Sequence, residues 1–511
     1  MNILYRSTRS DAAPVTASRA ILQGLAPDGG LYVPTAIPAL EKPLGELAGL
    51  SYRDLAYEVM RPFLSDFTEE ELRDCICRAY DEKFDDPAIA PLEERGGAYY
   101  LELFHGATIA FKDMALSILP HLMVTSAKKN REEQEIVILT ATSGDTGKAA
   151  MAGFADVPGT RIIVFYPKDG VSRIQERQMR TQRGANTAAV AIRGNFDDAQ
   201  TAVKRMFSDP ALGERIAAHG FRFSSANSIN IGRLVPQIVY YVYAYCQLLR
   251  RGAIAEDEKI NITVPTGNFG NILAADYAKQ MGLPVHRLIC ASNENRVLTD
   301  FFAGGVYDKN RPFLLTSSPS MDILVSSNLE RLVYRAAGED AEKTRSFMEQ
   351  LSSEGRYELS PEMRQAFAEF IGGCATEAEN FAGIRELYEN TGYVIDTHTG
   401  IANAVYRRYA KETGDTTPTV IASTASPYKF ANAVLGAIAP KEAEAILAGG
   451  ARDGEKTGEL ADFTLIDLLS KLSGTKEPAA ITDIRTAPIR HSRVCDIADM
   501  PETVLEILGI N

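Results

Sequence analysis

Short apolar runs alternate with segments of helical spacing through most of this 511-residue chain. A strand that is apolar along its whole length is buried on both faces, and strands separated by helices pair in parallel through crossover connections. The pattern therefore predicts an α/β fold whose parallel sheets carry helices on both faces. The apolar runs are 135–140, 161–166, 187–192, 260–265, 285–291 and 419–424, and the helical segments between them include 172–182, 196–207 and 232–249.

Length and a change of pattern divide the chain into three expected domains. A chain of this length exceeds what one ordinary hydrophobic core supports. Residues 1–95 are expected to form a mostly helical N-terminal domain, because apolar residues recur at helical spacing in 52–63 and 68–80. Residues 96–258 and 259–511 are expected to form two α/β domains, whose segments can interleave.

Charge and cysteine content narrow the class of protein. Lys and Arg number 54 against 67 Asp and Glu, and the net charge of −13 argues against a nucleic-acid partner. No apolar run reaches membrane-spanning length and no secretory signal is visible, so we expect no membrane partner. Six scattered cysteines and six histidines show no metal-ligand spacing, which predicts reduced thiols, a cytoplasmic location and no bound metal.

Lys112 is the first candidate for chemistry. It lies between the apolar run 109–111 and the expected start of a helix at Asp113. An ammonium with apolar neighbours loses hydration, so its pKa falls and its neutral amine can form a Schiff base with a carbonyl compound or with pyridoxal phosphate. From this stretch alone, an exposed lysine at a helix start is the simpler interpretation.

Two glycine-rich turns follow strands and precede helices, which is where open α/β sheets bind ligands. In the turn 266–271 (Thr-Gly-Asn-Phe-Gly-Asn), backbone N–H groups and the following helix dipole can face an anion, which favours a phosphate site over a plain tight turn. The turn 142–147 (Thr-Ser-Gly-Asp-Thr-Gly) suits a carboxylate or a second phosphate, and an ordinary N-capping loop explains it equally well.

Two further stretches place polar groups at helix starts. Arg233 heads a long apolar helix, where a guanidinium opposes the helix dipole and needs an anionic partner, which a structural Asp or Glu could equally supply. The hydroxyls of 423–426 precede Pro427, itself a helix-start signal, and one of them could contact a ligand. One lysine in an apolar setting and several anion-binding turns are what a pyridoxal-phosphate enzyme requires.

Taken together, these stretches resemble the threonine synthases, a family of fold-type-II pyridoxal-phosphate enzymes. The resemblance implies two parallel-sheet α/β domains with the active site between them, plus a mostly helical N-terminal domain. It implies a small-molecule substrate, O-phospho-L-homoserine, which the family converts with water into L-threonine and phosphate in the last step of threonine biosynthesis. We expect a monomer or a homodimer. The similar stretches are 5–9, 28–34, 105–113, 143–147, 227–233, 265–271, 318–323 and 422–430.

The resemblance also implies roles for individual residues. Lys112 would carry pyridoxal 5'-phosphate covalently and, once freed, act as the base for proton transfers. The pyridine nitrogen would face Thr424. The cofactor's phosphate would be held by Gly267, Asn268, Phe269, Gly270 and Asn271. The substrate carboxylate or the cofactor would lie against Ser143, Gly144, Asp145 and Thr146. The substrate phosphate would lie against Ser228, Asn230 and Arg233.

The chain departs from the family at Ala107, where Pro is frequent, at 396–400, where Asp-Pro-His-Thr-Ala is usual, and at Ser426, where the family usually has His. The missing imidazole removes a candidate proton donor and could alter the choice of substrate.

Two alternative functions stay open. One is a phospholyase on the same scaffold that releases phosphate from a related phosphoamino acid and yields a 2-oxo acid. The other is a non-catalytic phosphometabolite-binding protein, which would have no need of Lys112.

Overall fold

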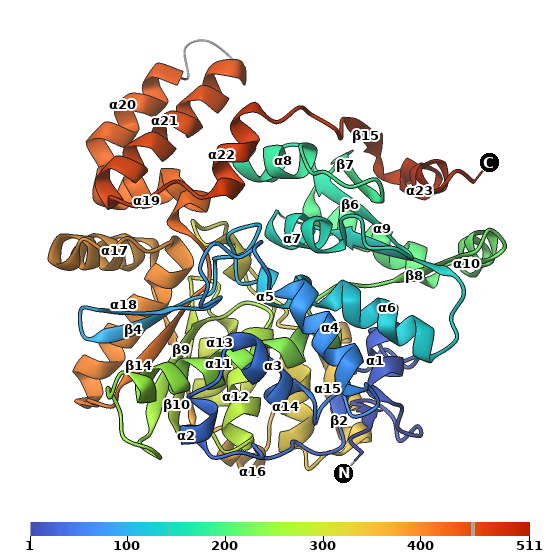
Figure 1. The fold of residues 1–511 in the computed structure, drawn as a ribbon, viewed down its shortest axis with the longest axis horizontal. Coiled ribbons are helices and arrows are strands. Elements are labelled where there is room, and N and C mark those ends of the chain that lie inside the picture. Colours follow the sequence, from blue (N-terminus) through green and yellow to red (C-terminus); the bar gives the residue numbers. More distant parts are fainter. Residues whose placement is uncertain (1, 143, 451–454, 511) are drawn as a thin grey trace.

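Two β-sheets covered by helices form the body of the computed structural model, which describes residues 2–142, 144–450 and 455–510 (Figure 1). One sheet has five strands in the order β15-β7-β6-β5-β8, and every neighbouring pair in it is parallel. Its strands are β5 (Glu135–Ala141), β6 (Thr160–Pro167), β7 (Thr187–Arg193), β8 (Phe221–Ser224) and β15 (Arg493–Asp496).

The other large sheet has six strands in the order β13-β10-β9-β14-β4-β3 and is parallel except for the β3–β4 pair. The strands β9 and β14 at its centre are buried along their whole length. The apolar runs are thus the buried strands of parallel sheets, which confirms the predicted α/β class. The six strands are β3 (Leu92–Arg95), β4 (Ala98–Glu102), β9 (Ile260–Pro265), β10 (Val285–Ser292), β13 (Phe370–Cys374) and β14 (Thr419–Ser423).

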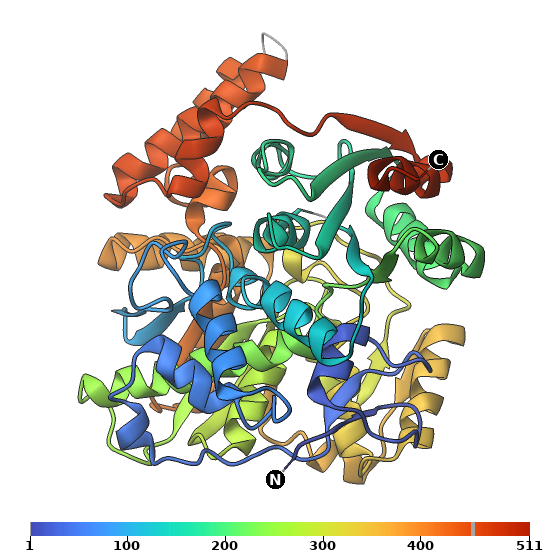
Figure 2. The same cartoon turned by 45° about the vertical axis from the view of Figure 1, so that its right-hand side comes forward.

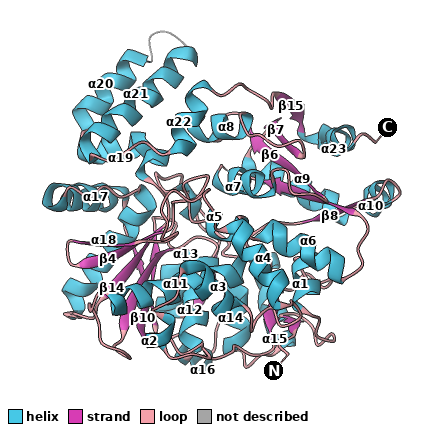
Figure 3. Cartoon of the chain, in the orientation of Figure 1, coloured by secondary structure: helices cyan, strands magenta, loops and turns pink. Residues whose placement is uncertain are grey.

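Helices cover both faces of each sheet, as Figure 3 shows by the cyan ribbons on either side of the magenta strands. One face of the five-stranded sheet packs on α9, α10 and α23, and the other on α7 and α8. In the six-stranded sheet, α11 and α12 cover one face and α17 and α18 the other. These helices are α7 (Asp145–Phe154), α8 (Arg173–Arg180), α9 (Phe196–Ser208), α10 (Pro210–Ala217), α11 (Ile231–Arg250), α12 (Gly270–Gln280), α17 (Glu377–Thr391), α18 (Thr397–Thr413) and α23 (Met500–Leu508).

Three strands cross the domain boundaries expected at residues 96 and 259. Strand β3, within the segment expected for the N-terminal domain, pairs with β4 at the edge of the six-stranded sheet. Strand β4 pairs with β14 in the six-stranded sheet, although it lies within the segment expected for the first α/β domain. Strand β15, close to the C-terminus, pairs with β7 in the five-stranded sheet. Pairing between distant segments depends on tertiary contacts, so local patterning could not show which sheet takes a given strand.

The N-terminal region is mostly helical and shares its core with the rest of the chain. Its helices pack in the same hydrophobic cluster as α11, and Figure 2 shows the blue N-terminal elements lying against the body of the molecule. Thr68 forms the capping box that begins α4, as its sequence context favours. The elements are β1 (Tyr5–Ser7), α1 (Ala17–Gln23), β2 (Tyr32–Pro34), α2 (Leu44–Leu47), α3 (Tyr52–Met60) and α4 (Glu69–Ala79).

The remaining elements connect the strands of the two sheets or follow β14 toward the C-terminus. The helices α19 to α22 pack in a small hydrophobic core that also includes Ile109, Ile174 and Val394, and they make the orange and red group at the top of Figure 1. None of the helices within the described residues is both long and apolar enough to cross a membrane. These elements are α5 (Asp113–Leu116), α6 (Leu119–Lys129), α13 (Val297–Gly304), β11 (Val306–Asp308), η1 (Pro319–Met321), α14 (Leu329–Ala336), α15 (Ala341–Ser353), β12 (Arg356–Glu358), α16 (Pro361–Gln365), η2 (Pro427–Phe430), α19 (Ala431–Ile438), α20 (Pro440–Gly450), α21 (Glu455–Ser473), α22 (Ala479–Thr486) and η3 (Ile497–Asp499).

Candidate active site

Lys112 lies immediately before α5, and its side chain is buried. Its Nζ donates a hydrogen bond to Ser320 Oγ at 3.2 Å and lies 3.5 Å from Asp145 Oδ2. The residue is only 9% exposed, so the interpretation as an exposed lysine at a helix start does not hold. Burial lowers the pKa of Lys112, the Asp145 carboxylate opposes this, and the positive charges of Lys429 and Arg233 lower the pKa further. The environment thus makes the neutral, nucleophilic amine more accessible.

Asp145 is shared between two lysines. Lys429 Nζ lies 2.9 Å from Asp145 Oδ1 and also donates to the Thr108 carbonyl oxygen at 3.0 Å. Gln175 Nε2 donates to the same carboxylate oxygen at 2.8 Å. Burial alone would raise the pKa of Asp145, but the ammonium groups of Lys429 and Lys112 outweigh it and hold that pKa well below its usual range. The carboxylate is therefore ionised and already paired.

Lys429 is a residue that the sequence analysis missed. It lies in the similar stretch 422–430, but nothing in the local pattern shows that its head is buried against a carboxylate from another sheet. The signal that could have found it is its position one residue before Phe430 in η2, close after the buried strand β14. A lysine so placed follows the ligand-binding end of a parallel sheet.

The turn 266–271 joins β9 to the N-terminus of α12, where the first helical N–H groups have no intrahelical partner. A Cβ on Gly267 would lie 2.3 Å from the Ser320 carbonyl oxygen, so only glycine fits there. Phe269 has a left-handed backbone (φ 64°), and its buried ring packs against Phe302 and Phe370. A left-handed backbone conformation in a non-glycine residue costs about 1 kcal/mol or more, and such residues are frequent at ligand sites. The packing of the Phe269 ring offsets this cost and stabilises the turn.

The carbonyl groups of this turn are held by a neighbouring segment. Ser326 Oγ donates to the Gly267 carbonyl oxygen at 2.7 Å, and Asn328 donates to the Asn268 carbonyl oxygen from its backbone N at 3.1 Å and from Nδ2 at 2.9 Å. Because the carbonyl oxygens of Gly267 and Asn268 already accept hydrogen bonds, the groups that the turn presents to a ligand are its N–H donors. An anion requires such donors.

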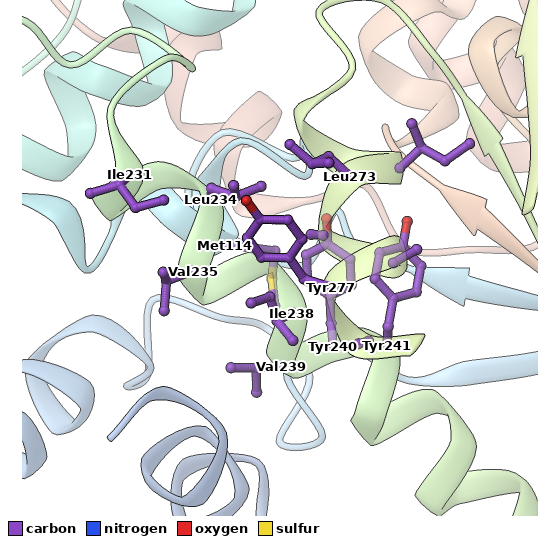
Figure 4. Packing of buried hydrophobic residues seen from close by; sticks show 14 of the residues in the cluster. Met114, Ile231, Leu234, Val235, Ile238, Val239, Tyr240, Tyr241, Leu273 and Tyr277 are labelled. Carbon is purple, nitrogen blue, oxygen red and sulfur yellow. The ribbon is translucent and has the colours of Figure 1, made fainter. Parts of the chain in front are cut away.

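Asn271, in the first turn of α12, presents an unpaired donor. Its Oδ1 accepts hydrogen bonds from Tyr240 at 2.6 Å and Tyr241 at 2.5 Å, two tyrosines that lie side by side on α11 in Figure 4. Its Nδ2 is buried and has no hydrogen-bond partner among the residues that the structure describes. A buried unpaired donor costs about 1–3 kcal/mol, which an acceptor on a bound ligand would offset. The turn and Asn271 together fit a phosphate group.

Arg233 is a buried cation at the head of α11. Its Nη1 donates to the Ala226 carbonyl oxygen at 2.8 Å, and its Nε has no hydrogen-bond partner within the described residues. None of the ion pairs found in the described part of the chain involves Arg233, so the structural salt bridge considered above is not observed there. Burial lowers the pKa of Arg233 to about 10. A buried guanidinium without a carboxylate requires another anion.

The two polar neighbours of Arg233 differ in what they can offer a ligand. Ser228 Oγ is half-buried and accepts a hydrogen bond from Asn328 Nδ2 at 3.4 Å. Asn230 caps α11 with Oδ1, which accepts from the Gly232 N at 2.9 Å, while its Nδ2 donates to the Ile21 carbonyl oxygen at 3.0 Å. Asn230 is thus committed to the backbone, and we expect it to position Arg233 without touching a ligand.

The turn 142–147 is partly a capping loop, and Ser143 lies outside the described residues. Thr142 Oγ1 accepts hydrogen bonds from the backbone N of Gly144 at 3.0 Å and of Gly147 at 2.9 Å. Gly144 has φ 135°, and a Cβ there would lie 2.5 Å from the Gln175 side chain. Thr146 is half-buried at the start of α7. The turn brings Asp145 beside Lys112, which its local sequence did not show.

Thr424 follows β14 and lies next to the Lys112 segment. Its carbonyl oxygen accepts a hydrogen bond from the Phe111 N at 2.8 Å, and Ala425 forms an isolated bridge with Ala110. The residue is buried. Thr424 therefore belongs to the same site as Lys112, although 312 positions separate them in the sequence.

Positive charge exceeds negative charge in this buried group. The positive charges of Arg233 and Lys429 act on Lys112, and the charge of Lys429 also acts on Lys148. Burial lowers the pKa of Lys148 to about 8. The carboxylates among them are Asp145 and Asp113, the latter of which accepts two hydrogen bonds from Thr108. In a chain with net charge −13, this local excess provides the anion-binding field that the whole molecule lacks.

The fold and the site define a pyridoxal-phosphate-dependent enzyme of fold type II. The chain matches the family described as "Pyridoxal-phosphate dependent enzyme" over residues 90–425, "Threonine synthase N terminus" over 4–80 and "Threonine synthase, C-terminal" over 399–457. It is 38% identical to the threonine synthase of Eremothecium gossypii over 465 residues, which cover 85% of this chain and 89% of the relative. The chain belongs to the threonine synthase family.

Two further comparisons agree with this assignment. A structure of pyridoxal-phosphate-bound threonine synthase from Brucella melitensis superposes with a TM-score of 0.84 at 34% identity and covers 99% of both chains. Threonine synthase-like 1 of Homo sapiens is 39% identical over 440 residues, or 83% of this chain, and the chain spans 58% of that relative's length. The predicted family, fold class and cofactor are confirmed: the chain belongs to a family of enzymes that use pyridoxal phosphate.

Proposed function

We propose that this protein is a threonine synthase, converting O-phospho-L-homoserine and water into L-threonine and phosphate by γ-elimination and β-hydration. The observation that carries the proposal is the buried guanidinium of Arg233 beside the Lys112 site, which pairs with no carboxylate among the residues that the structure describes. The cofactor's phosphate belongs to Gly267, Asn268, Phe269, Gly270 and Asn271, where glycine, the helix start and the Asn271 amide favour it. A second anion position at Arg233 and Ser228 then favours a substrate with its own phosphate.

The remaining site residues receive roles that their chemistry supports. Bound pyridoxal phosphate supplies the electron sink that acidifies the substrate at Cα and then at Cβ. Lys112 holds the cofactor and, when released, moves the protons, because its amine is buried and its pKa is lowered. Thr424 offers the pyridine nitrogen a hydroxyl, which does not enforce a protonated ring.

The turn before α7 suits the substrate carboxylate through its backbone and hydroxyl donors. Thr146 and Ser143 remain our candidates for this contact, whereas the Gly144 N–H already donates to Thr142 Oγ1 at 3.0 Å and Gly144 serves the shape of the turn. Asp145 is a poor partner for another carboxylate, because like charges repel, and it already pairs with Lys429 at 2.9 Å. We therefore assign Asp145 to the control of Lys112.

A phospholyase that yields a 2-oxo acid is the second candidate, and Ser426 is the observation that favours it. The buried Ser426 Oγ accepts a hydrogen bond from the Tyr428 N at 3.4 Å and caps η2, at the position where the family usually has a histidine. A serine engaged in capping cannot replace an imidazole as a proton donor near pH 7. Without that donor, the reaction could end in a 2-oxo acid.

The test is to incubate the cofactor-loaded protein with O-phospho-L-homoserine and to quantify phosphate, threonine and 2-oxobutyrate together. The Lys112→Ala variant, shown to be folded by circular dichroism, is the control. Equal amounts of phosphate and threonine, absent in the variant, would support threonine synthase. Phosphate with 2-oxobutyrate would favour the phospholyase, and no phosphate from loaded protein would refute both.

Location, assembly and domain boundaries also remain proposals. A cytoplasmic location fits the six free cysteines found in the described residues, and fractionation of cells would test it. A monomer or homodimer is to be checked by light scattering. We propose domains near 1–95, 96–258 and 259–511, with β4 and β15 exchanged between the two sheets.

A further inference from the structure

Two consecutive tyrosines of α11 contact the same oxygen atom of Asn271, at the start of α12. Tyr240 Oη donates a hydrogen bond to Asn271 Oδ1 at 2.6 Å, and Tyr241 Oη donates one to the same atom at 2.5 Å. Both tyrosines are fully buried and lie side by side in Figure 4, with their ring centroids 4.7 Å apart. Neighbouring residues of a helix do not usually face one partner, so the convergence of these two hydroxyls is a specific feature of the site.

The other end of the Asn271 amide points away from the tyrosines. Its Nδ2 is buried and has no hydrogen-bond partner among the residues that the structure describes. Asn271 is the last residue of the turn 266–271, in which two carbonyl oxygens already accept hydrogen bonds from Ser326 and Asn328. Nδ2 is therefore the side-chain donor that this turn offers to an anion.

A carboxamide carries an acceptor and a donor at two ends of nearly equal shape. An anion at the turn 266–271 is attracted by Nδ2 and would be repelled by Oδ1, so only one orientation of the Asn271 amide supports anion binding. In that orientation Oδ1 points into the hydrophobic core that α11 and α12 share, where an oxygen that has lost its hydration needs a donor from the protein. Tyr240 and Tyr241 supply that donor.

The presence of two donors keeps Oδ1 satisfied even when one proton is used elsewhere. Tyr240 Oη also lies 3.0 Å from Gln237 Oε1, and a hydroxyl has one proton, so Tyr240 cannot serve both acceptors at once. When this proton goes to Gln237, Tyr241 remains as the donor to Asn271. Within the described part of the chain, the hydrogen bonds to Asn271 Oδ1 come from these two tyrosines. Loss of one hydroxyl thus leaves a donor, and loss of both leaves none.

Both phenols remain protonated at neutral pH. Burial raises the pKa of Tyr240 and of Tyr241 well above the usual value of 10. A phenolate could only accept hydrogen bonds and would repel a nearby anion. The two hydroxyls are therefore able to act as donors whenever the turn holds a phosphate group at neutral pH.

We propose that Tyr240 and Tyr241 are positioning residues, which hold the Asn271 amide with Nδ2 toward the phosphate group of pyridoxal phosphate. The inference rests on the proposed assignment of that phosphate to the turn 266–271, and it is independent of the substrate. The hydroxyls act through Asn271 and not on Lys112. Their loss therefore weakens the hold on the phosphate group and leaves the reaction of the aldehyde group with Lys112 unchanged.

The test compares two ligands of the cofactor-free protein by absorbance titration. Pyridoxal carries the same aldehyde as pyridoxal phosphate but no phosphate, so the ratio of the two Kd values isolates the contribution of the phosphate group. We expect Tyr240→Phe combined with Tyr241→Phe to weaken pyridoxal-phosphate binding at least about tenfold, which corresponds to about 1.4 kcal/mol. The Kd for pyridoxal should not change. Either single variant should lose less than about threefold, because one donor remains.

Matched variants separate positioning from general packing. Tyr245→Phe removes a buried hydroxyl from the same helix, one that donates to the Glu258 carbonyl oxygen at 2.9 Å, and it should leave both Kd values unchanged. Asn271→Ala should weaken pyridoxal-phosphate binding as the double variant does, and adding the two tyrosine changes to it should cost little more. Binding of pyridoxal phosphate by the double variant within about threefold of wild type would overturn the proposal, as would an equal loss for pyridoxal.

The Asn271→Ala variant also separates this proposal from the assignment on which it rests. If Asn271→Ala changes the ratio of the two Kd values and the double tyrosine variant does not, the tyrosines are not positioning residues although the phosphate lies at the turn. If Asn271→Ala itself leaves the ratio unchanged, the assignment of the phosphate is wrong and the proposal falls with it.

A second readout is the ³¹P NMR signal of the bound cofactor. The resonance of a phosphate group responds to the hydrogen bonds that its oxygens accept. It should shift in the double variant, saturated with pyridoxal phosphate, and stay in place in Tyr245→Phe. An unshifted resonance in the double variant would contradict the proposed contact, even if the affinity had fallen.

Discussion

Arg331 Nε donates a 2.9 Å hydrogen bond to the carbonyl oxygen of Tyr32, which joins helix α14 to strand β2 of the N-terminal region. The same buried guanidinium donates to the carbonyl oxygen of Ile229 and to Asn328 Oδ1. Asn328 in turn holds the Asn268 carbonyl oxygen of the proposed phosphate turn. One side chain thus connects the N-terminal region to both proposed anion positions.

We predict that Arg331→Lys weakens pyridoxal-phosphate binding about tenfold, since a lysine replaces only part of three hydrogen bonds, each worth about 1 kcal/mol. The measurement is absorbance titration of the cofactor-free protein. Arg335→Lys is the matched control, because Arg335 lies one turn further along α14 and pairs with Asp276. Equal loss of affinity in both variants would mean that α14 acts only through general stability.

Lys429 should control the ionisation of Lys112. We predict that Lys429→Met raises the pKa of Lys112, because a like charge is lost and Asp145 is left to pair with Lys112 alone. The acidic limb of the pH–rate profile should move to higher pH, and the rate at pH 7 should fall about 10- to 100-fold. Lys429→Arg keeps the charge and serves as the control. An acidic limb that stays in place would show that Lys429 is only structural.

Arg233 should bind the substrate phosphate. A charge-assisted hydrogen bond is worth about 1.5–3 kcal/mol, so Arg233→Met should raise KM for O-phospho-L-homoserine about 10- to 100-fold. Exchange of the Cα proton of L-2-aminobutyrate in D₂O, followed by NMR, should change much less, because that amino acid carries no phosphate and is affected only through the loss of the Arg233 charge near Lys112. Arg250→Gln, at the exposed opposite end of α11, is the control. Loss of aminobutyrate exchange in Arg233→Met would point instead to a role in cofactor binding.

His105 should make stability depend on pH. Burial would lower its pKa, but hydrogen bonds to Asp85 and Glu102 raise it to about 9, above its usual 6.5. The charged form is therefore stabilising: the contribution is complete below pH 6.5 and is lost as the pH rises through about 9. The shift corresponds to about 3 kcal/mol.

Thermal unfolding at pH 6.5 and 9.5 tests this expectation. His105→Asn should lower Tm at pH 6.5 and have a smaller effect at pH 9.5. His219→Asn is the control, since that ring is exposed and hydrogen-bonds to the Arg215 carbonyl oxygen. A His105→Asn effect that is the same at both pH values would show that the charge is not what stabilises the fold.

Much of the fold was predictable because its signals are local. Continuous apolar runs such as 260–265 and 419–424 became the central strands β9 and β14, since full burial on both faces requires apolar residues throughout. The turn 266–271 was recognisable from its glycines, whereas the reason for Gly267 is a distant contact: a Cβ there would lie 2.3 Å from the Ser320 carbonyl oxygen. The sheet that takes β4 or β15 was not predictable, because strand pairing depends on distant partners.

The candidate site divides in the same way. Lys112 and Arg233 could be selected as candidates from the sequence. Lys112 is a charged residue next to an apolar run, and the charge of Arg233 opposes the dipole of the helix that it begins. Asn230 is the instructive exception: its type and position suited a ligand, but its amide is fully used in capping α11 and bonding to the Ile21 carbonyl oxygen. A polar residue at a helix start serves a cap or a ligand, and only its contacts distinguish the two.

By itself, the sequence predicted the α/β class, the buried central strands, and Lys112 and the glycine-rich turns as candidates for cofactor and anion binding, because these depend on residue type and near neighbours. Tertiary structure alone decided which charges meet. Ser320 reaches Lys112 across 208 positions, and Lys429 reaches Asp145 from the other sheet. Burial makes such pairs decisive, since a charge removed from water must find its partner among whatever groups the folded chain brings beside it.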